Sequence, residues 1–385
     1  MKLTQITEID ERLGALEQAV KPFSLRAAKH DKEKSFPVQN IKDLIGIGYT
    51  ALSVPRTYGG RGMSLYELVR AQEIIGKHDG STALSIGWHM GITKHLGENN
   101  IWDQDTYREF ANEVLHSGAL INNAATEPAT GSPTRGGKPE TTAAEAGGKW
   151  RINGRKTFTT LSPVLTHFVV SAGIKGTDKT ANFLVKRENK GLNIEETWDS
   201  VAMRATGSHD IVLKDAVVGK SDLVQELQPG NKGAQGWLLH IPACYLGIAR
   251  AAQEHAVQFA ATYSPNSIDG TISELPNVKQ KIGEMELKIV QSQHFLYSVA
   301  RQWDDISTSE QESMKALLGA VKHSVVNQSM EVVDLAMRIE GARSLSEQNP
   351  QQRYYRDVRA GLHNPPMDDM TIMQLAQEAI TKLTT

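Results

Sequence analysis

The sequence predicts an α+β protein with a central β domain (residues 119–225) between two helical domains (residues 1–118 and 226–385). Three observations support this prediction. Apolar residues recur every three or four positions in the first and last thirds of the chain, which is the period of one helix face. Short runs rich in β-branched and aromatic residues follow one another in the middle third. No internal repeat or low-complexity linker interrupts this order.

The first domain is predicted to contain helices separated by a glycine-rich break at residues 59–62. The apolar stripe of an early helix consists of Leu13, Leu16, Val20 and Phe23. A further helix is expected to begin after the break, because Ser64 and Glu67 have the spacing of a capping box.

The change of composition near Ala119 predicts a compact antiparallel sheet, folded as a barrel or a sandwich. Asn153-Gly154 lies between two strand-like runs and is the strongest short-range signal of a β-hairpin, because both turn positions favour positive φ. Further strands are expected at residues 168–170, 182–185 and 210–213.

The last domain is expected to contain two long neighbouring helices, which favour a four-helix bundle. The stripe of the first is Met285, Ile289, Leu296, Val299 and Trp303. The stripe of the second is Met314, Leu318, Val321, Val325, Val332 and Leu335. Ser309 and Glu312 have capping-box spacing before the second helix, and Gly341 is placed to end it.

Composition narrows the class of protein. The formal net charge is −2 and no basic segment stands out, so we expect no nucleic-acid partner. Cys244 is the only cysteine, which excludes an intrachain disulfide and favours a cytoplasmic protein. The N-terminus lacks the apolar core of a signal peptide, and no apolar stretch of about 18 residues predicts a membrane span. Motifs for phosphoryl transfer, zinc hydrolysis and thiol chemistry are absent, and no metal site is expected.

Several separated motifs resemble, in their order, those of the acyl-CoA dehydrogenase family, including its flavin monooxygenase branch. They are Pro55–Gly62, Thr126–Ser132 (TEPATGS), Asn153–Thr160 (NGRKTFTT), Met203–Asp210 (MRATGSHD) and Arg353–Ala360 (RYYRDVRA). Their positions extend the resemblance over roughly residues 10–380. The sequence of residues 206–210 (TGSHD) resembles most the monooxygenase branch.

The resemblance implies a flavin cofactor, FAD or alternatively FMN, beside the sheet. Thr126 would contact the isoalloxazine ring, Phe158 would cover one flavin face, and Thr160 would bond the reactive ring nitrogen. Ser132 would contact a phosphate-bearing ligand, and Gly341 would lie in a loop that contacts another subunit of a homodimer or homotetramer. A plainer interpretation stays open for these motifs, namely local hydroxyl-to-backbone bonds and ordinary strand packing.

The sequence departs from the family where the catalytic base is expected. Counted from Arg356-Asp357, the glutamate position is Pro365, which carries no basic side chain. Loss of a general base costs on the order of 10²–10⁴ in rate. The candidates to replace it are His363, Asp368, Asp369 and His240, although a lone histidine or aspartate in a polar loop is more often solvated.

Two further positions leave alternatives open. His209 is either a proton donor near the flavin or a turn residue beside a strand. The family's arginine-and-phenylalanine segment, which contacts the pyrophosphate of a neighbouring subunit's FAD, is expected near residues 263–266, where no arginine occurs.

The leading hypothesis is therefore a flavin-dependent oxidoreductase that transfers hydride from a small-molecule substrate of the acyl-CoA type to FAD. The alternative is a reduced-flavin-dependent monooxygenase of the same fold that acts on a small aromatic or sulfur compound. A third hypothesis is a flavin- or acyl-CoA-binding protein without turnover.

Overall fold

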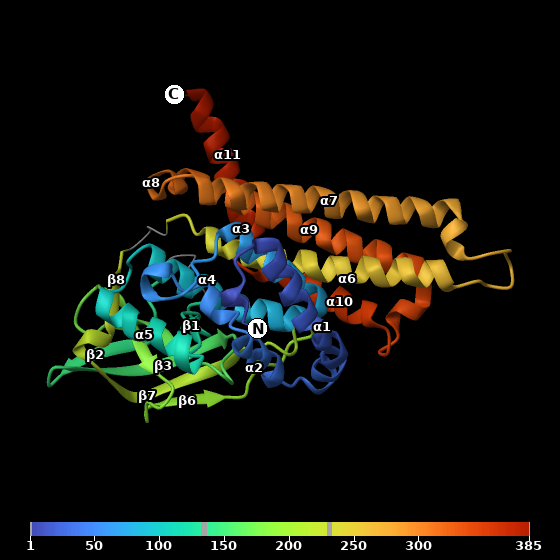
Figure 1. The fold of residues 1–385 in the computed structure, drawn as a ribbon. Coiled ribbons are helices and arrows are strands. Elements are labelled where there is room, and N and C mark those ends of the chain that lie inside the picture. The colour runs from blue at the N-terminus through green and yellow to red at the C-terminus, as the bar shows by residue number, and fades with distance from the viewer. Residues whose placement is uncertain (1, 132–136, 229–232, 385) are drawn as a thin grey trace.

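The computed structural model describes residues 2–131, 137–228 and 233–384 and places a sheet on one side of a helical body (Figure 1). Three long helices run side by side on the far side of that body, and the N-terminal helices lie between them and the sheet. The predicted order of helices, sheet and helices is confirmed.

The N-terminal helices are arranged around one that is buried on nearly every side. They are α1 (Ile9–Glu33), α2 (Val38–Gly46), α3 (Leu65–His78), α4 (Gly80–Glu98) and α5 (Gln104–Ser117), with short 3-10 turns at Leu3–Gln5, Thr50–Leu52 and Arg56–Tyr58. The predicted stripe of α1 is buried. Ser64 begins α3 as predicted, since its hydroxyl accepts a 3.0 Å bond from the Glu67 backbone N–H. Burial all round identifies α4 as the central helix.

The sheet is mixed rather than purely antiparallel. Its strands are β1 (Ile121–Ala124), β2 (Thr142–Ala146), β3 (Lys149–Thr159), β4 (His167–Ile174), β5 (Thr180–Lys186), β6 (Leu192–Glu195), β7 (His209–Gly219) and β8 (Leu223–Leu227). The order is β6-β7-β3-β2-β4-β5-β8, with β1 also paired to β4. β1 and β2 pair with successive parts of the same edge of β4, and both pairings are parallel.

The hairpin prediction at Asn153-Gly154 is wrong. β3 runs without a turn through this dipeptide, and the hairpin that joins β2 to β3 turns at Gly147-Gly148, where both φ values are positive. Asn153-Gly154 instead lies at a shift in the β3–β7 register, typical of a bulge. A side chain at Gly154 would clash, because its Cβ would lie 2.4 Å from Thr141 Oγ1. Pairing with strands on both edges therefore overrides the local turn signal.

The C-terminal helices are α6 (His240–Thr262), α7 (Pro276–Asp305), α8 (Thr308–Gln311), α9 (Lys315–Glu340), α10 (Pro350–Arg359) and α11 (Asp368–Thr384). Most of the two predicted apolar stripes is buried on α7 and α9, and Gly341 ends α9 with a φ of 65°. The helices α6, α7, α9 and α10 pack on one another as the expected bundle. The capping box forms at Ser307 and Glu310, two residues earlier than predicted.

The last helix projects from the body (Figure 1). Thr371 is its buried residue, while Met373 and Leu383 are 71% and 90% exposed. In the described part of the chain, none of the helices combines the length and the apolar character needed to cross a bilayer.

Candidate functional site

An exposed aromatic side chain stands out at the end of β3. The β3–β7 register shifts between Lys156 and Thr159, and Phe158 between them has a left-handed backbone with a φ of 56°. Its side chain is 59% exposed, whereas Lys156 and Thr159 are fully buried. The ring of Trp198 meets Phe158 edge-on, with 6.0 Å between ring centroids. The irregular backbone thus turns a large apolar ring out of the sheet.

A chain of hydroxyl groups begins next to this ring. Thr160 Oγ1 lies 2.8 Å from Ser208 Oγ, which lies 2.8 Å from Thr206 Oγ1. Thr206 in turn donates to the Met203 carbonyl at 3.0 Å. The Thr160 carbonyl accepts a 2.8 Å bond from the Asn122 side chain. The motifs at residues 153–160 and 203–210, which are far apart in sequence, are therefore joined at their hydroxyls.

The loop after β1 is fixed beside the same segment. The Thr126 carbonyl accepts a 2.9 Å bond from the Thr157 backbone N–H. The buried Glu127 carboxylate accepts from Lys156 Nζ at 2.7 Å and from the Thr141 backbone N–H at 3.0 Å. Burial raises the pKa of Glu127, but these donors outweigh it and bring the pKa to about 2. Thr126 is thus brought beside Phe158, whereas Ser132 lies outside the described residues.

This arrangement fits a flat, polar ring system. Phe158 offers exposed aromatic surface beside the half-buried Trp198, and aromatic rings pack well on such surface. Thr126 and Thr160 are only half-buried, so their groups are accessible at the edge of that surface. Thr126, Phe158 and Thr160, the three residues predicted to contact a flavin, therefore lie together at this end of β3.

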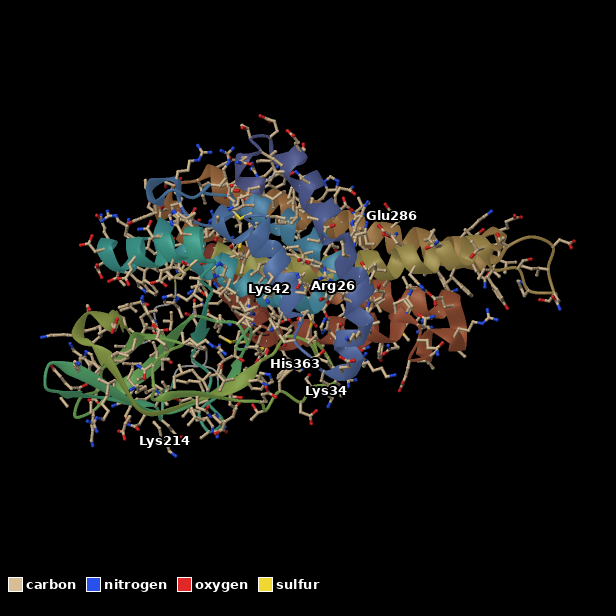
Figure 2. All side chains as sticks on the ribbon, turned by 60° about the horizontal axis from the view of Figure 1, so that its bottom comes forward. Arg26, Lys34, Lys42, Lys214, Glu286 and His363 are labelled. Carbon is tan, nitrogen blue, oxygen red and sulfur yellow. The ribbon has the colours of Figure 1, made fainter. Side chains whose placement is uncertain are left out.

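The segment after α10 holds the candidates for a base. Pro365 occupies the position expected for glutamate, so no carboxylate is present there. His363 ends a 3-10 turn (Ala360–His363) and is exposed. Figure 2 shows His363 on the side of the molecule where the sheet and the helices meet. Its neighbour Asn364 accepts a 2.6 Å bond from the Tyr245 hydroxyl, which attaches this turn to α6.

Asp368 is engaged by three groups of α9. Its carboxylate lies 3.2 Å from the buried Lys322 Nζ, 3.1 Å from His323 Nδ1 and 3.2 Å from Asn327 Nδ2. Burial raises the pKa of Asp368, but Asn327 and Lys322 outweigh it and hold the pKa below its ordinary value. The neighbouring Asp369 accepts a 2.9 Å bond from the Met370 backbone N–H. Asp368 therefore serves to attach α11 to α9, which disfavours it as a base.

His240 is buried among aromatic rings. Its ring lies parallel to Trp237 and edge-on to Trp88, with centroids 5.9 and 5.0 Å away. In the described structure neither ring nitrogen has a hydrogen-bond partner. Burial lowers the pKa of His240 to about 3, so the ring is neutral and a weak proton acceptor at neutral pH.

Two other predicted positions have different surroundings. His209 is the first residue of β7, and its Nδ1 accepts a 3.1 Å bond from the Trp198 backbone N–H. The His209 ring therefore helps to hold the segment that carries Trp198. Gly341 lies at the end of α9, and a Cβ built there would meet nothing within 4 Å. Residues 263–266 hold no arginine, but Arg343 stacks on the Tyr263 ring at 4.2 Å.

Comparison with known proteins identifies the family. The models for the N-terminal, middle and C-terminal domains of acyl-CoA dehydrogenase match residues 14–99, 122–216 and 239–364. "Putative acyl-CoA dehydrogenase YdbM" of Bacillus subtilis is 52% identical over 359 residues, which cover 93% of each chain. The chain belongs to the acyl-CoA dehydrogenase family.

Solved structures of other proteins share the fold at low identity. Butyryl-CoA dehydrogenase from Megasphaera elsdenii has a TM-score of 0.84 and 18% identity, over 98% of this chain and 99% of that one. Dibenzothiophene monooxygenase from Paenibacillus also has a TM-score of 0.84, with 20% identity over 96% and 97%. The acyl-CoA dehydrogenase fold therefore extends over nearly the whole chain.

Sequence reasoning missed Trp198 and the hydroxyl link from Thr160 to Ser208. Ser208 belongs to the motif at residues 203–210, but the sequence of that motif does not indicate that the Ser208 hydroxyl lies beside the Thr160 hydroxyl. Trp198 lies in a segment without regular secondary structure, where no period marks its orientation.

Proposed function

We propose that this member of the acyl-CoA dehydrogenase family is a flavin-dependent oxidoreductase of acyl-CoA-type substrates, with FAD as cofactor and FMN as the alternative. The observation that supports this proposal most is the cluster of Thr126, exposed Phe158 and Thr160 at the irregular end of β3. A bound flavin supplies a hydride acceptor for the β-carbon of a thioester.

The chain's own residues would hold and tune that group. Phe158, in contact with Trp198, would pack on one face of the ring, and Thr126 would lie at its edge. The Thr160 hydroxyl lies 2.8 Å from Ser208 Oγ, and by turning away from Ser208 it would donate toward negative charge on a bound ring. Preorganised donors of this kind stabilise developing charge, because they need not reorient during the reaction.

The proton from the α-carbon needs a different acceptor from the usual glutamate. Asp368 is paired with Lys322 and bonded to Asn327, and His240 is buried with a pKa of about 3. None of the hydrogen bonds or ion pairs found in the described residues engages His363. We therefore assign proton acceptance to the His363 imidazole, whose turn is fixed to α6 through Asn364.

Anaerobic titration of the flavin-loaded protein with short to long acyl-CoAs tests this activity. Bleaching of the oxidised flavin band is expected with at least one thioester. His363→Gln should slow bleaching about 10²-fold or more. His294→Gln, which changes an exposed histidine of α7, is the matched control and should leave the rate unchanged. Equal rates for both variants would remove His363 from the proposal.

A reduced-flavin-dependent monooxygenase is the second candidate. Pro365 has no basic side chain, and the Asp368 carboxylate is already paired with Lys322. The lack of a free carboxylate base favours this candidate, because oxygenation of a small aromatic or sulfur compound does not require an α-proton to be removed. Substrate-dependent oxygen uptake with added reduced flavin, together with no bleaching by thioesters, would favour this candidate. Flavin or thioester binding with neither activity would indicate a binding protein without turnover.

A further inference from the structure

The turn that carries His363 is attached to the helical body on both sides of that residue. The turn (Ala360–His363) follows α10 and contacts α6 and α9. Gly361, which precedes His363, is buried against those helices, and Asn364, which follows it, hydrogen-bonds to α6. Both attachments involve one side chain of α6, Tyr245.

Gly361 lets the turn approach Tyr245 closely. A Cβ built at Gly361 would lie 3.0 Å from Tyr245 Cδ2 and 2.7 Å from Val326 Cγ1. Carbon atoms pack best at about 3.5–4.0 Å, so a larger residue would push the turn away from α6 and α9. The Tyr245 side chain is fully buried and has close-packed neighbours, so its ring has no room to move aside. Contact with this ring therefore fixes the first side of the turn.

The Tyr245 hydroxyl fixes the other side of the turn. It donates a 2.6 Å bond to Asn364 Oδ1. The two residues after Asn364 are prolines, which have no backbone N–H to donate. Burial raises the pKa of the Tyr245 phenol well above its ordinary value, so the hydroxyl stays a donor at neutral and moderately alkaline pH. The side-chain bond thus supplies an attachment that backbone donors cannot supply at this point.

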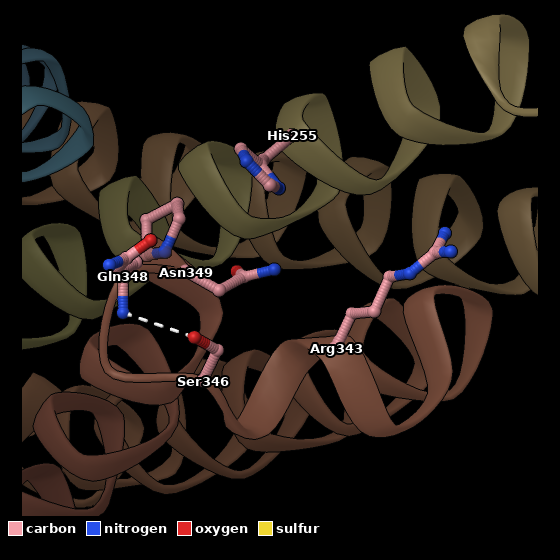
Figure 3. A pocket seen from close by; sticks show the side chains of 6 residues that line it. His255, Arg343, Ser346, Gln348 and Asn349 are labelled. Carbon is pink, nitrogen blue, oxygen red and sulfur yellow. Dashed lines mark hydrogen bonds between the residues drawn. The ribbon is translucent and has the colours of Figure 1, made fainter.

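The Tyr245 hydroxyl lies apart from the other polar features of α6. A polar pocket lined by His255 and Arg343 lies about three helical turns further along α6 (Figure 3). Near the start of α6, the His240 ring contacts the rings of Trp88 and Trp237. Removal of the Tyr245 hydroxyl is therefore expected to act on the His363 turn and to leave these two regions unchanged.

We propose that Tyr245 is a positioning residue, which holds the His363 imidazole on the side of the molecule where the sheet and the helices meet (Figure 2). This inference rests on the proposed function, in which His363 accepts the α-proton. A base works only within hydrogen-bond reach of the proton that it removes, and a small displacement of a reacting group costs a large factor in rate. Tyr245 acts through Gly361 and Asn364 and accepts no proton itself.

Single-turnover bleaching by a saturating acyl-CoA tests this role. Tyr245→Phe keeps the ring and removes the hydroxyl, so it should slow bleaching about tenfold while the thioester Kd changes less than about twofold. Tyr107→Phe is the matched control, because the buried Tyr107 hydroxyl also donates one bond, of 2.8 Å, to the Thr93 carbonyl. The control should leave the bleaching rate unchanged. Asn364→Ala removes the acceptor from a half-buried position, so it tests the same bond if the Tyr245 variant does not fold.

A double variant separates positioning from general damage to the fold. When Tyr245→Phe is added to His363→Gln, no further slowing is expected, because the Tyr245 hydroxyl acts only through His363. A further loss of about tenfold in the double variant would overturn the proposal. Wild-type bleaching rates in both Tyr245→Phe and Asn364→Ala would do so as well.

Amide hydrogen exchange of residues 361–364 gives a readout that does not depend on activity. Exchange there should quicken about tenfold in Tyr245→Phe and stay unchanged in Tyr107→Phe. If the wild type bleaches with no thioester, the proposed function fails, and exchange alone decides whether Tyr245 holds the turn. Unchanged exchange in Tyr245→Phe would overturn the positioning role even if His363→Gln shows that His363 is needed.

Discussion

The carboxylate of Asp357 accepts a 2.6 Å hydrogen bond from the backbone N–H of Met203, 154 positions away in the sequence. Met203 has a left-handed φ of 50° at the turn that leads to Thr206 and Ser208. The neighbouring Arg356 donates to the Val201 carbonyl at 2.8 Å. α10 therefore holds the loop whose hydroxyls reach Thr160.

This contact predicts a pH-dependent stability. Burial raises the pKa of Asp357 to about 7, against about 3.9 in an unfolded chain. Because the folded pKa is higher, this group costs no stability below about pH 4. The unfolding free energy falls between about pH 4 and 7, where the unfolded chain is ionised and the folded one is still protonated, and the loss is complete above about pH 7. Asp357→Asn keeps an acceptor oxygen without the charge. Between about pH 5 and 8, the wild type should lose roughly 3 kcal/mol of unfolding free energy relative to this variant. Urea unfolding at both pH values measures this, and parallel behaviour of the two proteins would contradict it.

Thr160 is expected to make flavin reduction easier. Thr160→Val removes the hydroxyl at nearly constant volume, so the midpoint potential should fall by about 20–40 mV, equivalent to one hydrogen bond. Thr159→Val is the matched control, because the buried Thr159 hydroxyl has no partner in the described structure. Spectroelectrochemical titration compares the two variants. Equal potentials would show that the Thr160 hydroxyl does not meet the ring.

Phe158 is expected to affect flavin binding rather than stability. Because the side chain is 59% exposed, Phe158→Ala should change the unfolding free energy by less than about 0.5 kcal/mol. Its flavin Kd should rise about tenfold, as lost aromatic stacking predicts. Leu25→Ala, at an 85% exposed position on α1, serves as control for both measurements. Unchanged flavin affinity in the Phe158 variant would place the flavin elsewhere.

The buried pair Lys156–Glu127 is expected to be needed for the loop that carries Thr126. The two side chains are 0% and 1% exposed and lie 2.7 Å apart. Lys156→Met leaves the Glu127 carboxylate buried without its cation and should lower the unfolding free energy by about 3–5 kcal/mol. The double variant Glu127→Gln with Lys156→Met should recover part of that loss. A single variant as stable as the wild type in urea would refute this role.

The sequence predicted elements whose signals are local or periodic. The stripes of α1, α7 and α9 were identified because burial on a helix repeats every three to four residues. The predicted hairpin at Asn153-Gly154 was wrong, because the turn preference of this dipeptide is a local signal. Pairing of β3 with β2 on one edge and β7 on the other outweighs that preference. The parallel pairing of β1 with β4 depends on long-range topology, which periodicity does not encode.

For the candidate site too, local motifs could be identified from the sequence, whereas tertiary contacts could not. Thr126, Phe158 and Thr160 were named from motifs, and the described structure brings them together. The contact between Asp357 and Met203 and the stacking of Arg343 on Tyr263 join segments far apart in sequence. The engagement of Asp368 by Lys322 is likewise a tertiary contact, and it removes a candidate that sequence alone could not distinguish from His363.

The most direct test of the central claim is anaerobic titration of the flavin-loaded protein with a series of acyl-CoAs, with chemical reduction by dithionite as a control. The proposed function predicts that the oxidised flavin band bleaches with at least one thioester and that the matching enoyl-CoA appears in equal amount. If dithionite bleaches the flavin but no thioester does, hydride transfer from acyl-CoA is contradicted and oxygenation by reduced flavin becomes the leading function.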